Sequence, residues 1–136
     1  MHSAAVALEV AFWQATICNI SLGVSALVLK IPKGGRLMRG TTPTHMFKLP
    51  FDTAQIKSIK VTYAHDKIPV LTKQTEDCTL VDHTITLRLT QEDTLLFENN
   101  WLVEVQLRVL MQNGDALRSK VYCLNAGVLL DDEVMV

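Results

Sequence analysis

The segment most informative about the fold is WLVEVQLRVLM, Trp101–Met111, which is followed after one residue by Asn113–Gly114. Apolar and polar residues alternate along it, and the apolar set is Val103, Val105, Leu107, Val109 and Met111. Strict alternation predicts a half-buried β-strand, because successive side chains of a strand point to opposite faces. The Asn-Gly pair predicts a hairpin with a type I′ turn, since both residues tolerate positive φ. We expect the return strand over residues 116–126.

The same alternation continues upstream and makes the rest of the chain β as well. Strands are predicted over residues 44–49, 58–63, 68–72, 78–81 and 84–89, with turns at 64–67 and 82–83. Pro69 indicates an edge position for its strand, because proline cannot donate to a ladder. A short helical piece is expected over Gln91–Phe97, with Thr90 as N-cap and Asp93 in a capping box. About seven strands with frequent turns predict an all-β, Ig-like antiparallel β-sandwich, to which a partly open barrel is the alternative.

Charge divides the 136-residue chain into two unlike parts. Residues 38–136 carry ten Lys/Arg and thirteen Asp/Glu, whereas no charged residue occurs from Val10 to Leu29. We therefore expect a β-sandwich domain over 38–136, preceded by an apolar leader and linker over 1–37 that would be helical if it belongs to the natural protein. A formal net charge of −1 gives no basic footprint for nucleic acid, so no nucleic-acid partner is expected.

The leader has three interpretations that the sequence leaves open. Residues 10–29 are long enough to cross a bilayer core of roughly 30 Å, and the basic residues from Lys30 onward would keep that end in the cytoplasm. Alternatively, PKGGRLM (32–38) has the purine-rich coding pattern of a ribosome-binding site before a start codon, so that residues 1–37 are a mis-annotated extension and Met38 is the natural start. The third interpretation is a buried helix.

Side chains able to support catalysis or bind a metal are scattered rather than clustered. The cysteines are Cys18, Cys78 and Cys123, and the histidines are His2, His45, His65 and His83. No CxxC, HxH or HExxH spacing occurs, so we expect no metal site, no cofactor and no catalytic set. The histidines are expected to be solvated on turns or strand faces. Cys78 and Cys123 fall on different predicted strands, where they either bridge the two sheets or stay free as small core residues.

The C-terminal residues combine apolar and acidic side chains. Asp131, Asp132 and Glu133 could hold a cation, but a solvated tail is the expected state. The apolar residues in the run VLLDDEVMV (128–136) give two further alternatives. Either the tail adds as a strand to the sheet of a neighbouring molecule, or it closes its own sandwich as a last strand.

Five leucines form the candidate interaction surface. The set is Leu102, Leu110 and Leu124, on the faces opposite the core stripes of their predicted strands, with Leu129 and Leu130 in the tail. Apolar side chains on the outside of a small sandwich are typical of protein contacts. Single scattered apolar residues also occur on ordinary surfaces, which is the alternative interpretation.

Several stretches of residues 38–136 resemble one group of small proteins. They are MRGTTPTHMFKLPFD (38–52), IKVTY (59–63), DCTL (77–80), TITLRLTQEDTLLF (84–97), NGDAL (113–117) and LDDEV (130–134). The chain is similar in these stretches to uncharacterised proteins encoded in phages and prophages of gut Firmicutes. The opening Phe-x-Leu-Pro strand is also loosely similar to the N-terminal module of phage upper-baseplate proteins. The resemblance brings no catalytic residues with it and does not extend into residues 1–37.

The resemblance implies a non-enzymatic structural or accessory protein of a phage or prophage, associated with the tail or baseplate. Its expected partners are other phage structural proteins or a second copy of the chain, and its expected place is the bacterial cytoplasm or the virion. Two alternatives remain at this point. The chain is a small β-domain anchored in the inner membrane if residues 10–29 are a genuine anchor, or it is a small enzyme or metal-binding protein.

Overall fold

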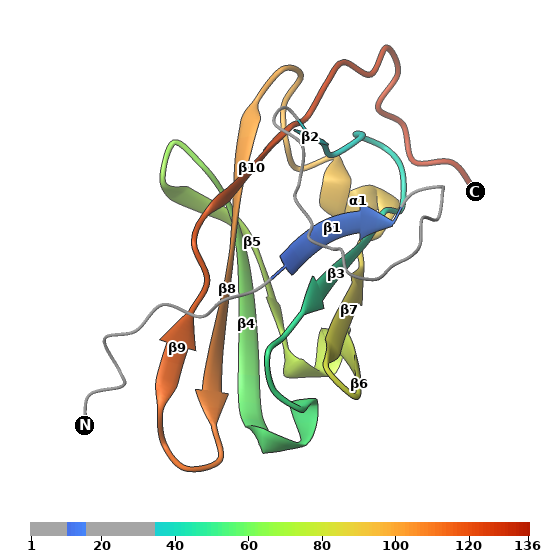
Figure 1. Ribbon diagram of the computed structural model, residues 1–136. Helices are drawn as coiled ribbons and strands as arrows, with labels where there is room; N and C mark the ends of the chain where they lie inside the picture. Colours follow the sequence, from blue (N-terminus) through green and yellow to red (C-terminus); the bar gives the residue numbers. More distant parts are fainter. Residues whose placement is uncertain (1–10, 16–34) are drawn as a thin grey trace.

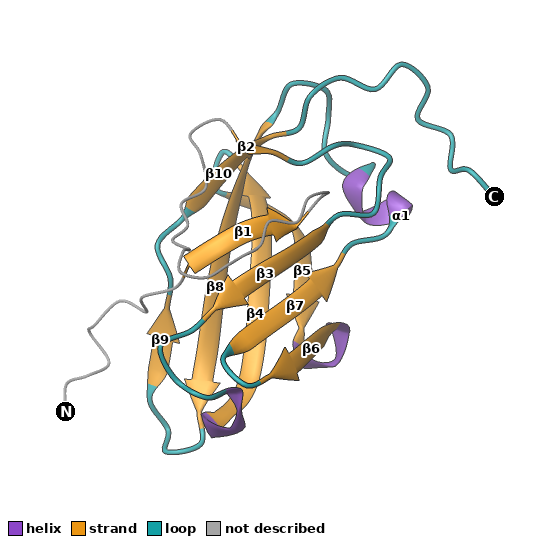
Figure 2. Cartoon of the chain, turned by 45° about the vertical axis from the view of Figure 1, so that its right-hand side comes forward, coloured by secondary structure: helices purple, strands orange, loops and turns teal. Residues whose placement is uncertain are grey.

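Two β-sheets pack face to face in the computed structural model, which describes residues 11–15 and 35–136 (Figures 1 and 2). The first sheet has the order β1 (Ala11–Ala15), β3 (Thr44–Lys48), β7 (Thr84–Arg88) and β6 (Cys78–Val81). The second has the order β2 (Gly35–Arg36), β10 (Tyr122–Asn125), β8 (Leu102–Met111), β4 (Ile56–His65) and β5 (Ile68–Gln74), with β9 (Ala116–Arg118) also paired to β8. Among the described strands every pair is antiparallel except β2 with β10. The all-β sandwich predicted from the sequence is confirmed.

The core is made by the inward faces of the long strands. The alternating set of β8 is buried as predicted. It packs with inward residues of the other strands, which include Phe47, Ile59, Val61, Tyr63, Ile85 and Leu87, and with Leu89, the residue after β7. Burying each of these large side chains contributes about 1.5–3 kcal/mol before the entropy cost of ordering it. Burial of these inward-facing side chains therefore supplies most of the free energy that holds the two sheets together.

The β8–β9 hairpin forms where the sequence predicts it, but the turn type is different. Gly114 has a φ of 96°, whereas Asn113 is not among the described residues with positive φ. The Gly114 N–H donates to Met111 O at 2.9 Å, and the Met111 N–H donates to Asp115 O at 2.8 Å. The loop therefore has three residues with glycine in the left-handed position, and the type I′ prediction is wrong.

Two consecutive residues with positive φ lie instead between β4 and β5. Asp66 and Lys67 have φ values of 56° and 66°, the pair of conformations that a two-residue hairpin turn needs. Ala64 and His65, which we predicted in this turn, belong to β4. The edge position predicted for the strand containing Pro69 is confirmed, because β5 is the last strand of its sheet.

The return strand is interrupted at Ser119, so that it becomes β9 and β10. The buried Ser119 side chain accepts a hydrogen bond from the Leu107 N–H at 3.0 Å and donates to Lys120 O at 2.7 Å. A serine hydroxyl thus takes a place in the ladder that a backbone carbonyl would otherwise occupy. The prediction of one continuous strand over 116–126 is wrong for this reason.

The helical piece is one turn, α1 (Gln91–Thr94), and is shorter than the predicted Gln91–Phe97. Its capping box is confirmed: the Asp93 N–H donates to Thr90 Oγ1 at 3.0 Å, and the Thr90 N–H donates to Asp93 Oδ2 at 2.9 Å. Asp93 also forms an ion pair with Lys73 of β5 at 3.0 Å. Two single 3₁₀ turns, η3 (Thr53–Gln55) and η4 (Thr75–Asp77), complete the elements.

Part of the apolar leader lies against the sandwich. Residues 11–15 form β1, which pairs antiparallel with β3 from Ala11 opposite Lys48 to Ala15 opposite Thr44. The expectation of a helical leader is therefore wrong for these five residues, which form a strand. The other residues of the expected 10–29 membrane segment lie outside the described part of the chain. Within the described ranges, no helix has the length and apolar character needed to cross a membrane.

Candidate functional site

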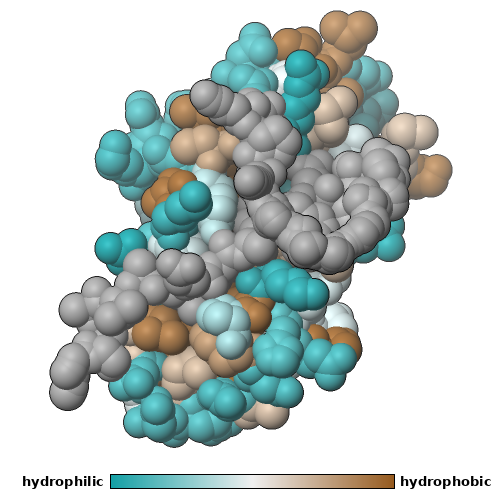
Figure 3. All heavy atoms as spheres, in the orientation of Figure 1, coloured by the Kyte–Doolittle hydropathy of each residue, from teal (hydrophilic) through white to brown (hydrophobic). Residues whose placement is uncertain are grey.

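The exposed apolar side chains are concentrated at one end of the sandwich. We call this region the tail end and define it by the C-terminal segment 126–136, the 38–41 loop, the segment from α1 to Leu102 and the β4–β5 turn through Ile68. Eight of the ten large exposed hydrophobic residues of the described ranges belong to it: Met38, Ile68, Leu96, Leu102, Val128, Leu130, Met135 and Val136. Figure 3 shows hydrophobic side chains at the top of the molecule, over the C-terminal segment. Such a concentration of apolar surface is typical of a protein contact.

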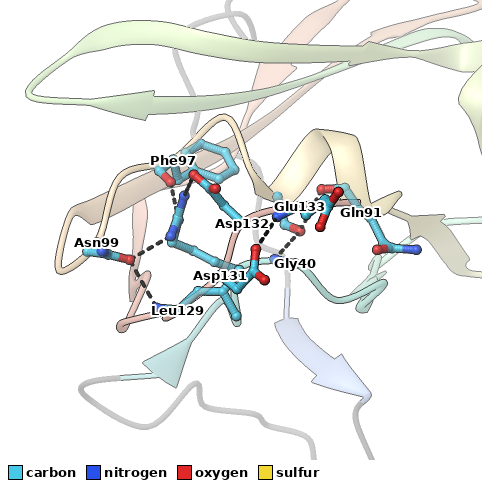
Figure 4. Close-up of polar contacts among 10 residues, drawn as sticks. Gly40, Gln91, Phe97, Asn99, Leu129, Asp131, Asp132 and Glu133 are labelled. Atoms are coloured by element: carbon cyan, nitrogen blue, oxygen red, sulfur yellow. Dashed lines mark hydrogen bonds and ion pairs between the residues drawn. The ribbon is translucent and has the colours of Figure 1, made fainter. Parts of the chain in front are cut away.

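Beyond Gly127, side chains rather than a strand ladder hold the C-terminal segment in place. Before that point the Ala126 N–H donates to Trp101 O at 2.8 Å, and Gly127 O accepts from the Asn100 N–H at 2.7 Å. No described residue after Asn125 belongs to a strand. The Asn99 Oδ1 atom accepts a hydrogen bond from the Leu129 N–H at 3.0 Å (Figure 4). Further along, the Gln91 side chain accepts from the Met135 N–H at 2.9 Å and donates to Met135 O at 3.1 Å. The expectation that the tail closes its own sandwich as a last strand is therefore wrong.

Arg39 is the buried centre of the tail end. Its Nε donates to Phe97 O, and its Nη1 donates to Asn99 Oδ1 at 2.6 Å. Its Nη2 lies 3.9 Å from Asp132 Oδ2, and the two side chains are 7% and 73% exposed. One guanidinium therefore fixes the segment after α1 directly and the tail through Asn99 and Asp132, because its rigid fork presents several donors at once.

The loop that carries Arg39 is fitted closely to the tail. Gly40 has a φ of +76°, and a Cβ atom on it would lie 2.8 Å from Leu129 Cδ2. The Gly40 N–H donates to Thr94 Oγ1 at 2.9 Å, and this hydroxyl donates to Thr41 O at 2.9 Å. The positive φ favours glycine here, and a Cβ atom would in addition displace the methyl end of the Leu129 side chain.

Three of the five predicted interaction leucines belong to the tail end. Leu102 is 51% exposed and Leu130 is 97% exposed, whereas Leu129 is partly buried and its Cδ2 atom lies close to Gly40. Leu110 is partly buried and eight residues from Leu102 on β8, a distance of about 26 Å at the usual rise of a strand. Leu110 therefore belongs to the opposite end of the sheet.

Leu124 is wrongly assigned to the surface. It is 1% exposed, and its Cα is paired with that of the buried Val103. The interruption at Ser119 changes which alternate residues of the return strand face the core, so that Tyr122 and Leu124 point inward and Cys123 outward. A continuous strand would have placed Leu124 outside.

The two described cysteines and the acidic residues of the C-terminal segment lie apart from one another in the sequence and differ in their exposure. Cys78 and Cys123 lie on different sheets as free thiols, and Cys123 is exposed rather than part of the core. Burial raises the pKa of the Cys78 thiol to about 11. Asp131, Asp132 and Glu133 are all exposed, and the described residues contain no group of His, Cys, Asp and Glu that could hold a metal ion.

The histidines differ most from expectation. His45 is fully buried in β3, with its Nδ1 2.6 Å from Tyr63 OH, and burial lowers its pKa to about 3. The prediction that it is solvated is wrong, and its alternation with Phe47 was the available signal, since both face the core. His65 stacks on Trp101 with ring centroids 4.0 Å apart, and its Nδ1 lies 3.2 Å from Leu102 O, which fixes the β4–β5 turn beside the tail end.

A broad hollow lies at the other end of the molecule. It has a volume of about 670 Å³ and is lined by residues that include Lys48, Asp82, His83 and Thr84. It is open on the outer face of the first sheet. Comparison with protein-family models and with curated proteins found no match to this chain.

Proposed function

We propose that the chain is a non-enzymatic structural or accessory protein of a phage or prophage, associated with the tail or baseplate of the phage particle. It acts through protein–protein contacts made by its own tail end, the region around its C-terminal segment. One observation carries the proposal: the exposed apolar side chains gather around a C-terminal segment that Arg39 and Gln91 hold in a fixed course. The resemblance of residues 38–136 to phage and prophage proteins supports the biological setting.

The arrangement of the tail end favours contact with a protein. A side chain such as Leu130 gains free energy when a partner removes it from water, at about 25 cal/mol for each Å² of apolar area. The hydrogen bonds to Leu129 and Met135 limit the freedom of the segment before binding, which lowers the entropy cost of association. We expect the partner's surface to contain apolar pockets that accept these side chains.

The charge of the C-terminal segment indicates what kind of partner surface fits it. Asp131, Asp132 and Glu133 stand exposed between the apolar residues of the segment. Acidic residues at the rim of a contact favour a partner with basic residues around its own apolar centre, because complementary charges steer association and set the register. A structural protein with a basic-rimmed apolar groove fits both features.

The test is the composition of purified phage particles. We expect mass spectrometry to detect the chain in purified particles of the phage that encodes it, which are assembled in the bacterial cytoplasm. The variants Leu102→Asp and Val128→Asp should be lost from particles, because each places a charge in the contact. Val81→Asp is the matched control, since Val81 is 57% exposed but is the last residue of β6, away from the tail end.

Two results would contradict the proposal. The first is absence of the unmodified chain from purified particles and from their assembly intermediates. The second is incorporation of the Leu102 and Val128 variants at the level of the Val81 variant, with circular dichroism showing that all three remain folded.

A further inference from the structure

The strand from the leader covers an edge that the sandwich otherwise leaves open. β1 pairs with β3 over five residues, from Ala11 opposite Lys48 to Ala15 opposite Thr44. Without β1, β3 would end the sheet order β3-β7-β6 and present a row of unpaired backbone groups. Figure 2 shows β1 lying alongside β3 in the front layer.

The other edges of the described sheets have features that discourage pairing, and β3 has fewer. β5 contains Pro69 and Lys73, and proline and lysine both discourage the addition of a strand. β6 has four residues, β9 three and β2 two, which leaves little ladder for a partner. β3 has five residues with no proline, and its lysine is the last of them. The β3 edge is therefore the one best suited to accept a strand.

The connection between β1 and the sandwich is long. Residues 16–34 separate Ala15 from Gly35, and nineteen residues can span roughly 60 Å at full extension. The ten residues of β8, the longest strand together with β4, span about 33 Å. The chain length thus allows β1 to reach β3 of another molecule as well as its own.

We propose that residues 11–15 of one copy pair with β3 of a second copy, and that the exchange is reciprocal. The five cross-strand pairs are the same in the closed monomer and the exchanged dimer, so the exchange gives up no pair of the ladder. Because pairing within one chain is intramolecular, the closed form dominates in dilute solution. Exchange then dominates where copies are crowded together, as at one place in an assembly.

The experiment places single cysteines at a paired position. The background is the full chain with Cys18→Ser, Cys78→Ala and Cys123→Ser, because these thiols would otherwise compete. One variant carries Ala11→Cys and the other carries Lys48→Cys, whose Cα atoms are register partners. The two variants are mixed at high concentration and oxidised, and the linked peptides are identified by mass spectrometry.

The expected result is a disulfide between residue 11 of one molecule and residue 48 of another, with a doubled mass in analytical ultracentrifugation. The matched control replaces Ala11→Cys by Ala15→Cys, which lies opposite Thr44 at the far end of the ladder and cannot reach residue 48. A chain that carries both Ala11→Cys and Lys48→Cys tests the pairing itself.

Two outcomes would overturn the proposal. If the double variant closes a disulfide within one chain but the mixture gives no intermolecular product above the control, β1 stays with its own β3. If the double variant forms no disulfide, β1 does not occupy this edge in solution. Neither outcome affects the proposed function of the tail end, because that proposal rests on residues at another surface.

Discussion

Burial of His45 makes the stability of this protein depend on pH in a range where most carboxylates stay charged. The folded protein holds the imidazole neutral, because burial lowers its pKa from 6.5 to about 3. In the unfolded chain the same group titrates near 6.5. Between these values the unfolded state binds more protons than the folded state, so stability is lost as the pH falls below 6.5.

The size of the effect follows from the two pKa values. Between pH 6.5 and about 3, each unit by which the pH falls lowers the free energy of unfolding by about 1.4 kcal/mol, because the unfolded state binds one more proton than the folded state. At pH 5.0 the expected loss from His45 is therefore about 2 kcal/mol, which is a large part of the 5–15 kcal/mol typical of a small domain.

His45→Gln isolates this contribution. Glutamine does not titrate and can still form a hydrogen bond with Tyr63 OH, so the variant removes the protonation step while a partner for the phenol remains. The free energy of unfolding in urea is measured for both proteins at pH 7.5 and 5.0 by circular dichroism. We expect the parent chain to lose about 2 kcal/mol more than the variant between the two pH values.

Other titrating groups should cancel or fall outside this window. His65 and His83 are present in both proteins. Burial by itself would raise the pKa of Asp93, but the hydrogen bond from the Thr90 N–H and the Lys73 ion pair hold it below its usual value. The stability that Asp93 contributes is therefore lost only at a lower pH, when its carboxylate becomes protonated. Equal losses of stability in the parent and in His45→Gln would refute the reasoning, as would an NMR titration that places the pKa of His45 near 6.5 in the folded protein.

Three further predictions concern the tail end and the cap beside it. Arg39→Met should cost about 2 kcal/mol and should speed proteolysis of the chain after residue 126, whereas Arg118→Met, on an exposed strand position, should leave the cleavage rate unchanged. Gly40→Ala should lower the melting temperature more than Gly114→Ala, because both have positive φ but only the first Cβ meets Leu129. Asp93→Ala should cost about 1 kcal/mol in urea unfolding through the lost cap and ion pair, and a loss no larger than that of Glu92→Ala, an exposed neighbour in the same turn, would count against the cap.

The sequence predicts the strands well because their burial follows from simple alternation. Val103 to Met111 and Ile85 to Leu89 each bury one face, and a period of two is visible without knowledge of the partner strand. The face of Leu124 could not be predicted in the same way, since it depends on the hydroxyl of Ser119 taking a ladder position against Leu107. A local pattern carries no information about such a long-range hydrogen bond.

The candidate site was predicted only in part for a related reason. Leu102, Leu129 and Leu130 can be recognised as apolar residues at positions expected to be exposed, but Arg39 reads as one more residue of the basic run that begins at Lys30. Its role depends on Phe97 and Asn99, which lie 58 and 60 residues away in the sequence. The same holds for the contact of Gly40 with Leu129, a residue at the far end of the chain.

The topology also explains why the tail is available to a partner. After Asn125 the natural continuation would be a strand beside β10, but β2 already pairs with that side of β10, from Gly35 opposite Leu124 to Arg36 opposite Asn125. The Leu37 N–H extends this contact by donating to Asn125 O at 2.9 Å. The tail is therefore directed away from its own sheet and onto the Arg39 loop, where side chains rather than a ladder hold it. A segment held in this way keeps its course while leaving Leu130 exposed, which is the arrangement that the proposed contact requires.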